Sequence, residues 1–279
     1  MKKDKSSMSA AGVAGLRAIE AEKPETTRIS YDPLAHAFVP GFITFQLSKL
    51  MINSGLYERM APGAVAFIML RERYIDEVLI KSLHEGLDQV VILGAGFDTR
   101  AYRIAGIEKT RVFEVDRPAT QEIKLEKLKK VVDPLPGHVT FVPVDFNTQA
   151  LGDRLLASGY LENGKTLFIW QGVTYFLTPK GVDGTLAFIA SHSGPGSTVI
   201  FDYMHSETLR DPRVKRAAKM SGEEYVFGID QGQVEPFLSS RGFRDIRNVT
   251  PEDLKQLYLT GPNAGRAVNK GIDIVSARV

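Results

Sequence analysis

The pattern of apolar residues in the first 85 positions of the chain is typical of helices. The segment 10–22 is rich in alanine, 42–57 carries apolar residues at mixed spacing, and in 62–83 apolar residues recur at helical spacing. We therefore expect residues 10–85 to form a mainly helical region. Residues 1–9 are polar and basic and lack an apolar stretch, which predicts a disordered, solvated tail.

The pattern changes at Gln89. Short apolar runs rich in Val, Ile and Phe then alternate with helical stretches, which predicts βαβ units around a mostly parallel sheet buried on both faces. The five runs cover residues 89–94, 110–116, 138–145, 166–172 and 197–204. Two more runs, 243–250 and 271–279, alternate apolar and polar residues, as strands near a sheet edge do. We therefore predict an α/β protein with seven strands, the last two added as an antiparallel, hairpin-like pair.

Two arginines in the third helical segment lie on different sides of the predicted helix. Arg71 shares the apolar face with Ile75, whereas Arg73 lies where Asp76 and Glu77 can pair with it. An arginine within an apolar face needs an anion to offset its desolvation. Arg71 is therefore the better candidate to bind an anionic group of a ligand.

Composition narrows the function classes. The chain has 279 residues, 43% of them apolar and 24% charged, and a formal net charge of +2. The small charge excludes a nucleic-acid binder that relies on bulk charge, and we expect no nucleic-acid partner. No apolar run approaches the ~18 residues of a membrane span, and we expect no membrane partner. The absence of cysteine excludes disulfides and thiolate metal sites and fits a cytoplasmic protein, and no His, Asp and Glu residues have metal-ligand spacing.

Ligands of open α/β sheets bind at the carboxyl ends of the strands, so the residues that end each run are candidate site residues. The first run ends in Gly94, Gly96 and Asp98 of the turn GAGFDT. Two glycines let the backbone turn sharply and approach a ligand closely. A dinucleotide-binding loop has a third glycine where this chain has Thr99. The turn therefore favours a nucleoside ligand without a pyrophosphate.

The next two runs end in acidic residues. Asp116 follows Gly94 by 22 positions, the distance at which a carboxylate meets the hydroxyls of a ribose. Asp145 and Phe146 end the third run, where an acid can accept from an adenine amino group and a phenylalanine can form an apolar wall. Each residue alone is equally typical of a strand-end cap. Together with the glycine turn they indicate an adenosine site.

The fourth and fifth runs end in aromatic and titratable residues. Gln171 and Tyr175 follow the fourth run and belong either to a pocket floor or to a core aromatic cluster. Tyr203 and His205 end the fifth run, and His205 is either a base or an ordinary surface or core histidine. The polar segment 205–228 is either a solvated helix face or a charged cap that attracts an anionic substrate.

Three stretches of the chain contain these candidate residues together with other polar residues at defined positions. They read VVILGAGFDTRAYRI at 90–104, FEVDRPATQEIK at 113–124 and VPVDF at 142–146. Together they resemble the leucine carboxyl methyltransferase-like family of S-adenosylmethionine enzymes, in particular its bacterial branch named after a tetracenomycin polyketide-synthesis O-methyltransferase. Further matches lie at DPLAHAFV (32–39), RERYIDEVL (71–79) and QGVTYFL (171–177), and the resemblance spans residues 12–279.

The resemblance implies a seven-stranded, mostly parallel, Rossmann-like methyltransferase sheet at 86–279 under an N-terminal helical lid at 10–85. It implies S-adenosyl-L-methionine as the methyl donor, with an arginine on the methionine carboxylate, glycines at the methionyl part, Asp116 on the ribose and Asp145 with Phe146 on the adenine. The expected cofactor-binding set is Arg71 or Arg73, Gly94, Gly96, Asp98, Asp116, Asp145, Phe146 and Gln171.

One position departs from the family pattern. The family has Glu where this chain has Gln171, near the amino group of the cofactor. An amide keeps an acceptor oxygen but loses the charge. Either cofactor affinity is lower here or another acid such as Asp202 compensates, and we expect Gln171→Glu to tighten binding.

These observations predict an O-methyltransferase that transfers a methyl group in line to a small-molecule carboxylate or hydroxyl. A carboxylate is ionised at neutral pH and needs no base, whereas a phenol benefits from one. The candidates to orient the acceptor are Tyr175, Tyr203 and His205. The alternatives are a catalytically weak nucleoside-binding protein, a protein C-terminal carboxyl methyltransferase and a nicotinamide dehydrogenase. The identity of the acceptor and the oligomeric state stay open.

Overall fold

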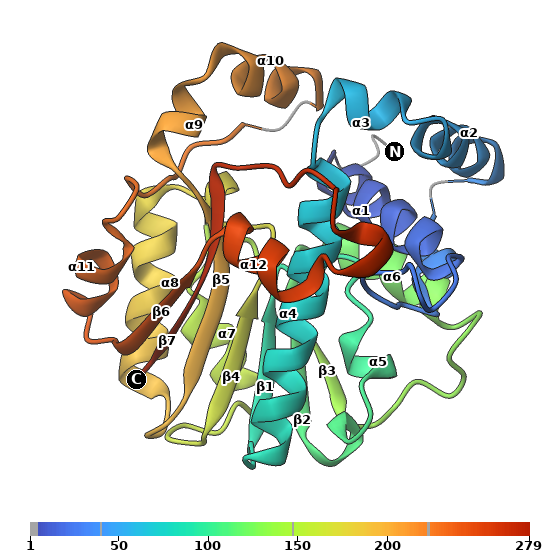
Figure 1. Cartoon of the computed structure of the whole chain (residues 1–279). Helices are drawn as coiled ribbons and strands as arrows, with labels where there is room; N and C mark the ends of the chain where they lie inside the picture. The colour runs from blue at the N-terminus through green and yellow to red at the C-terminus, as the bar shows by residue number, and fades with distance from the viewer. Residues whose placement is uncertain (1–4, 40, 147, 222–223) are drawn as a thin grey trace.

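The computed structural model describes residues 5–39, 41–146, 148–221 and 224–279, and a seven-stranded sheet forms its centre (Figure 1). The strands are β1 (Gln89–Leu93), β2 (Arg111–Asp116), β3 (Val139–Pro143), β4 (Thr166–Trp170), β5 (Thr198–Met204), β6 (Arg244–Val249) and β7 (Ile272–Arg278). Their order across the sheet is β3-β2-β1-β4-β5-β7-β6, and β1 to β5 pair in parallel. The predicted α/β fold with seven strands is confirmed.

The last two strands differ from the expected hairpin at the sheet edge. β7 lies between β5 and β6 and pairs antiparallel with both, and β6 forms the edge of the sheet opposite to β3. The helix α12 (Pro251–Tyr258) connects β6 to β7, so no tight turn joins them. Burial explains the arrangement, because Ile274, Val275 and Ala277 of β7 are fully buried. The two strands therefore form the predicted antiparallel pair near a sheet edge, although a helix instead of a tight turn connects them.

Helices cover both faces of the sheet. Alternate residues of the central strands point to opposite faces, so Val90 and Val91 belong to different core clusters. On one face pack α4 (Ala64–His84), α5 (Arg100–Arg103) and α12, and on the other pack α7 (Leu151–Ala157), α8 (Pro179–His192) and α11 (Val234–Ser239). Such burial on both faces is why the parallel strands read as continuous apolar runs.

The N-terminal helices lie at the end of the sheet where the parallel strands finish (Figure 1). They are α1 (Lys5–Ala21), α2 (Phe42–Asn53) and α3 (Leu56–Met60), with the short helix η1 (Ala35–Phe38) between α1 and α2. The first of them begins at Lys5, so residues 5–9 are helical rather than part of a tail. Residues 1–4 of the predicted tail lie outside the described residues.

The remaining helices connect the strands. They are η2 (Ile107–Lys109), α6 (Pro118–Leu128), η3 (Thr174–Phe176), α9 (Ser206–Arg210), α10 (Pro212–Ser221) and η4 (Gly261–Asn263). The predicted charged cap 205–228 contains α9 and α10, except that residues 222–223 lie outside the described part of the chain. Among the described residues, no helix combines the length and apolar character needed to cross a bilayer.

Candidate functional site

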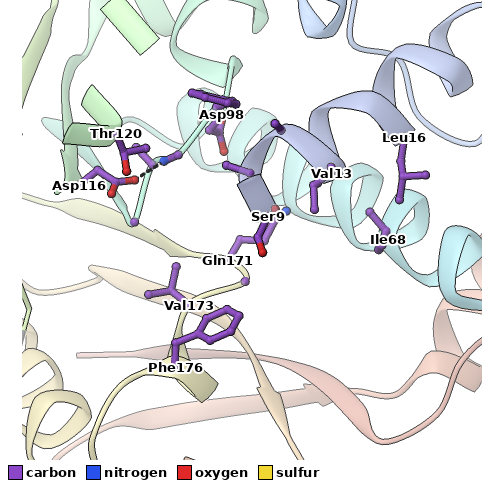
Figure 2. Close-up of a pocket in the computed structure, with 18 of the residues that line it drawn as sticks. Ser9, Val13, Leu16, Ile68, Asp98, Asp116, Thr120, Gln171, Val173 and Phe176 are labelled. Carbon is purple, nitrogen blue, oxygen red and sulfur yellow. Dashed lines mark hydrogen bonds between the residues drawn. The ribbon is translucent and has the colours of Figure 1, made fainter. Parts of the chain in front are cut away.

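A cavity of about 1300 Å³ opens where β1, β2 and β4 end (Figure 2). Its floor is the turn after β1, and its walls come from α1, α2, α4 and the segment around Tyr225. Ligand pockets in proteins typically measure about 300–1,000 Å³. The cavity is therefore large enough for a nucleoside cofactor together with a second small molecule.

The backbone conformations of Gly94 and Gly96 explain why glycine occurs at both positions of the turn. Gly94 has φ +65°, and a Cβ placed there would lie 2.3 Å from Cγ2 of Val173. Gly96 has φ +43°, and its N–H donates to the Asp116 carboxylate across the turn. Left-handed backbone favours glycine, and the contact with Val173 leaves no room for a side chain. Both glycines line the cavity.

Asp116 reaches the cavity from the end of β2 (Figure 2). One carboxylate oxygen accepts from Gly96 and the other accepts the Arg117 N–H at 2.6 Å. Burial raises the pKa of this carboxyl, and the two N–H donors oppose that rise. Each oxygen has a further lone pair, so Asp116 is held in place and still able to accept from hydroxyls in the cavity.

The remaining residues of the stretch GAGFDTRAYR (94–103) connect the turn to the helical region. Arg100 is fully buried and binds the carboxylates of Asp98, Glu72 and Asp76. Burial acts to raise the pKa of Asp98, but the charges of Arg100, Lys124 and Arg17 together with the Arg100 N–H outweigh burial and lower this pKa to about 2. Thr99, in place of a third glycine, donates to Asp32 at 2.8 Å. The motif thus fixes the turn, and Asp98 lies on the cavity wall with its charge already paired.

The stretch EVDRPATQEIK (114–124) has a similar structural role. Glu114 and Lys124 form a buried ion pair at 2.6 Å between β2 and α6. The Gln121 amide donates to the carbonyls of Glu114 and Val142, which joins the ends of β2 and β3. Only Asp116 of the residues named by this motif carries a carboxylate to the cavity.

The two candidate arginines of α4 lie where the helical pattern predicts. Arg71 is 4% exposed, lines the cavity, and forms an ion pair with Asp202 at the end of β5. The other oxygen of Asp202 accepts the Gly172 N–H at 2.6 Å. Arg73 instead pairs with Glu77 at 3.1 Å on an exposed surface, outside the cavity. Of the two, only Arg71 can meet a ligand there.

Gln171 lines the same wall as Arg71 and has a partner that sequence reasoning missed. Its Nε2 donates to Oε1 of Glu72 at 2.7 Å, and its own Oε1 is buried without a hydrogen-bond partner in the described structure. Glu72 follows Arg71 directly on α4 and is 1% exposed. No motif pointed to Glu72, because a glutamate within a helix is ordinarily solvated.

Not every predicted site residue reaches the cavity. Phe146 and Tyr175 line it, whereas Asp145 is not among the described residues that do. Tyr203 donates to Asn248 at 3.1 Å, and His205 lies with Nε2 3.1 Å from the carboxylate of Asp273. Both side chains contact the neighbouring strands β6 and β7, and neither is among the described residues that line the cavity, so their role as acceptor-orienting residues stays a prediction without support from this geometry.

Much of the cavity lining is apolar and was not predicted from the sequence. Val13, Leu16 and Ile68 lie across from Asp116 and Thr120 (Figure 2). The other large apolar and aromatic lining residues include Phe45, Met51, Ile52, Tyr57, Phe176 and Val226. Tyr175 and Tyr225 pack edge to face with ring centroids 5.5 Å apart, and Phe176 lies 5.2 Å from Tyr225. These residues come from five helices and from the loop that holds Tyr225 and Val226, so only tertiary structure brings them together.

Comparison with known proteins agrees with this geometry. The profile of the leucine carboxyl methyltransferase family matches residues 10–190. YktD of Bacillus subtilis, named as a candidate S-adenosyl-L-methionine-dependent methyltransferase, is 37% identical over 69% of this chain and 66% of its own length. A similarly named Streptomyces coelicolor protein is 33% identical over 67% of this chain and 65% of its own. The chain thus covers just under two thirds of these relatives.

A solved structure shares the fold. The crystal structure of a duf574 family protein from Streptomyces avermitilis superposes with a TM-score of 0.61, covering 95% of this chain and 96% of that one, at 13% identity. The likeness extends over the helical region as well as the sheet.

Proposed function

Because the chain belongs to the leucine carboxyl methyltransferase family, we propose that it is an S-adenosyl-L-methionine-dependent O-methyltransferase acting on a small-molecule carboxylate or hydroxyl. The observation that carries the proposal is one cavity with two kinds of lining. Asp116 and the glycine turn form the part that we call the polar half, and Val13, Leu16 and Ile68, on the opposite side in Figure 2, belong to the part that we call the apolar half. Such a division suits a nucleoside cofactor beside an organic acceptor.

The residues of the polar half fit this cofactor. Asp116 would accept from the ribose hydroxyls, and Phe146 would pack on the adenine. The backbone turn at Gly94 would lie against the methionyl part. Arg71 would bind the methionine carboxylate, since its buried Nε has no hydrogen-bond partner in the described structure. Asp145 is left out of this set, because it does not line the cavity.

When bound, the sulfonium cofactor supplies a methyl group that is already activated for displacement. The chain therefore has to position the acceptor and exclude water. Phe45 of α2 and Tyr57 of α3 would close the cavity on the side of the N-terminal helices. In this proposal α2 and α3 act as a lid. A carboxylate acceptor needs no proton removal at neutral pH, so the site requires no base for it.

Tyr175 is the one acceptor-orienting candidate that lines the cavity. Burial raises the pKa of its hydroxyl, and the nearby charge of Asp202 raises it further. The hydroxyl therefore stays protonated at neutral pH and can donate to an acceptor oxygen. We assign Tyr175 a positioning role, and Tyr175→Phe is expected to raise KM for the acceptor more than it lowers cofactor affinity.

The test is transfer of a radiolabelled methyl group to a library of small carboxylates and phenols, followed by identification of the methylated oxygen. Methyl esters or ethers formed by the wild type support the proposal. Binding of the cofactor without turnover on any compound would favour the catalytically weak nucleoside-binding alternative. Methylation of peptide C-termini alone would favour the protein carboxyl methyltransferase.

A further inference from the structure

The amide of Gln171 is held in one orientation. A carboxylate can only accept, so the 2.7 Å contact with Glu72 Oε1 requires that the NH₂ of Gln171 face Glu72. The carbonyl oxygen Oε1 is then the atom left buried without a partner. A buried acceptor with no donor is unfavourable. A ligand that brings an N–H to this wall of the cavity would satisfy it.

Glu72 keeps its charge in this position. Its second oxygen accepts from Arg100 Nη2 at 2.6 Å, and its side chain is 2% exposed. Burial acts to raise the pKa of Glu72, but the charges of Arg100 and Arg17 outweigh burial and lower it. The carboxylate is therefore ionised at neutral pH, and Glu72 itself is among the residues that line the cavity, beside the Gln171 amide.

The surroundings of Glu72 carry an excess of negative charge. Two sets of buried ion pairs meet on α4, and we call them together one network: one joins α1, α4 and the turn after β1, and the other joins Arg71 to Asp202 of β5. It contains the five carboxylates of Asp32, Glu72, Asp76, Asp98 and Asp202 and the four guanidiniums of Arg17, Arg71, Arg100 and Arg103. This network is complementary to a ligand that brings a cation to the β4 side of the cavity.

The position of the orphan oxygen indicates which group of the cofactor it meets. Asp116, at the β2 end, is placed for the ribose, so the adenosine half belongs on that side of the glycine turn. Gln171 follows β4 on the other side, next to Arg71. The amino-acid end of the cofactor would lie there, and its α-ammonium is the N–H donor of that end.

We propose that Glu72 is a positioning residue: it holds the Gln171 amide so that Oε1 accepts from the cofactor α-ammonium, and its charge replaces the one that an amide at 171 lacks. This inference rests on the proposed function, because it assumes that the cavity binds S-adenosylmethionine. It assigns the compensating acid to Glu72 rather than to Asp202, because Glu72 is the acid that hydrogen-bonds the Gln171 amide, whereas Asp202 bonds Arg71 and the Gly172 N–H.

Calorimetric titration of the full chain with two nucleosides tests the proposal. S-adenosylhomocysteine has the ammonium, and 5′-methylthioadenosine lacks the whole amino-acid end. We expect Glu72→Gln to weaken S-adenosylhomocysteine binding about tenfold, the size of a charge-assisted hydrogen bond. Binding of 5′-methylthioadenosine should change less than about twofold, since the ammonium is absent. Glu77→Gln, on the exposed side of the same helix, is the matched control and should change neither.

The double variant Glu72→Gln/Gln171→Glu exchanges the amide and the carboxylate. It should restore S-adenosylhomocysteine affinity to within about threefold of wild type, because the two positions act as one unit. Equal weakening of both nucleosides by Glu72→Gln, or no recovery in the exchanged variant, would overturn the role of Glu72. A wild type that binds neither nucleoside would instead overturn the proposed function, and this inference with it.

Discussion

Arg71 of α4 and Asp202 at the end of β5 form a buried ion pair that joins two segments 131 residues apart. Their side chains are 5% and 0% exposed. The pair lies beside Gln171 on the cavity wall, and Asp202 also accepts from the Gly172 backbone. This contact fixes the position of α4 relative to the end of β5 beside the cavity.

Asp202→Asn is expected to destabilise the fold, because Arg71 would stay buried with no opposing charge. Breaking one partner of a buried pair typically costs about 3–5 kcal/mol. The free energy of unfolding in urea measures the effect. Asp183→Asn, which removes the exposed partner of Arg241, is the control, and a surface pair contributes about 1 kcal/mol or less. Equal losses in the two variants would contradict the assigned importance of the Arg71–Asp202 pair.

Asp116→Ala is expected to abolish cofactor binding, because it removes the proposed ribose acceptor and the acceptor of the Gly96 N–H. Calorimetry with S-adenosylmethionine gives the affinity. Asp145→Ala is the matched strand-end control, and since Asp145 does not line the cavity it should bind nearly as wild type. Unchanged affinity in Asp116→Ala would remove Asp116 from the site.

Gln171→Glu alone was expected to tighten binding, and the structure changes this expectation. A carboxylate at 171 would lie against that of Glu72, where the amide now lies at 2.7 Å. Two adjacent carboxylates raise one another's pKa, so one proton would be shared between them and the ion-pair network would be disturbed. We expect lower thermal stability and no gain in affinity at neutral pH. A tighter complex at unchanged stability would show that the two side chains separate.

Stability in acid should depend on Asp98. Its folded pKa of about 2 lies below the ordinary 3.8, so its ionisation stabilises the fold above that ordinary value. This contribution, about 2 kcal/mol, is lost as the pH falls from about 4 to about 2. Asp116 acts in the opposite direction, because its pKa is raised. Subtracting the unfolding free energies of Asp98→Asn from those of the wild type isolates the contribution, and a pH-independent difference would contradict it.

Local pattern was enough to predict the parallel strands and to identify Gly94, Gly96 and Asp116, which line the cavity. Buried parallel strands read as apolar runs, and the spacing between Gly94 and Asp116 follows from the length of one βα unit. Helical periodicity predicted that Arg71 is buried and Arg73 exposed, because a residue of α4 is buried when it lies on the side that faces the sheet. In these cases the determining contacts are close in sequence or imposed by the strand ends.

The remaining features depend on contacts distant in sequence. The place of β7 between β5 and β6 is set by pairing across the sheet. Tyr203 and His205 lie at the end of β5, as Asp202 does, yet their side chains contact residues of β6 and β7. A rule that selects strand ends does not show which of these side chains face the cavity. Glu72 is recognised only through the side chain of Gln171, 99 residues away.

A crystal structure of the chain with S-adenosylhomocysteine tests the central claim most directly. We predict the adenosyl group against Asp116 and Phe146, and the amino-acid end between Arg71 and Gln171. The apolar half lined by Phe45 and Tyr57 would stay free for the acceptor. Density for the nucleoside outside this cavity, or a dinucleotide with its pyrophosphate across the glycine turn, would contradict the account.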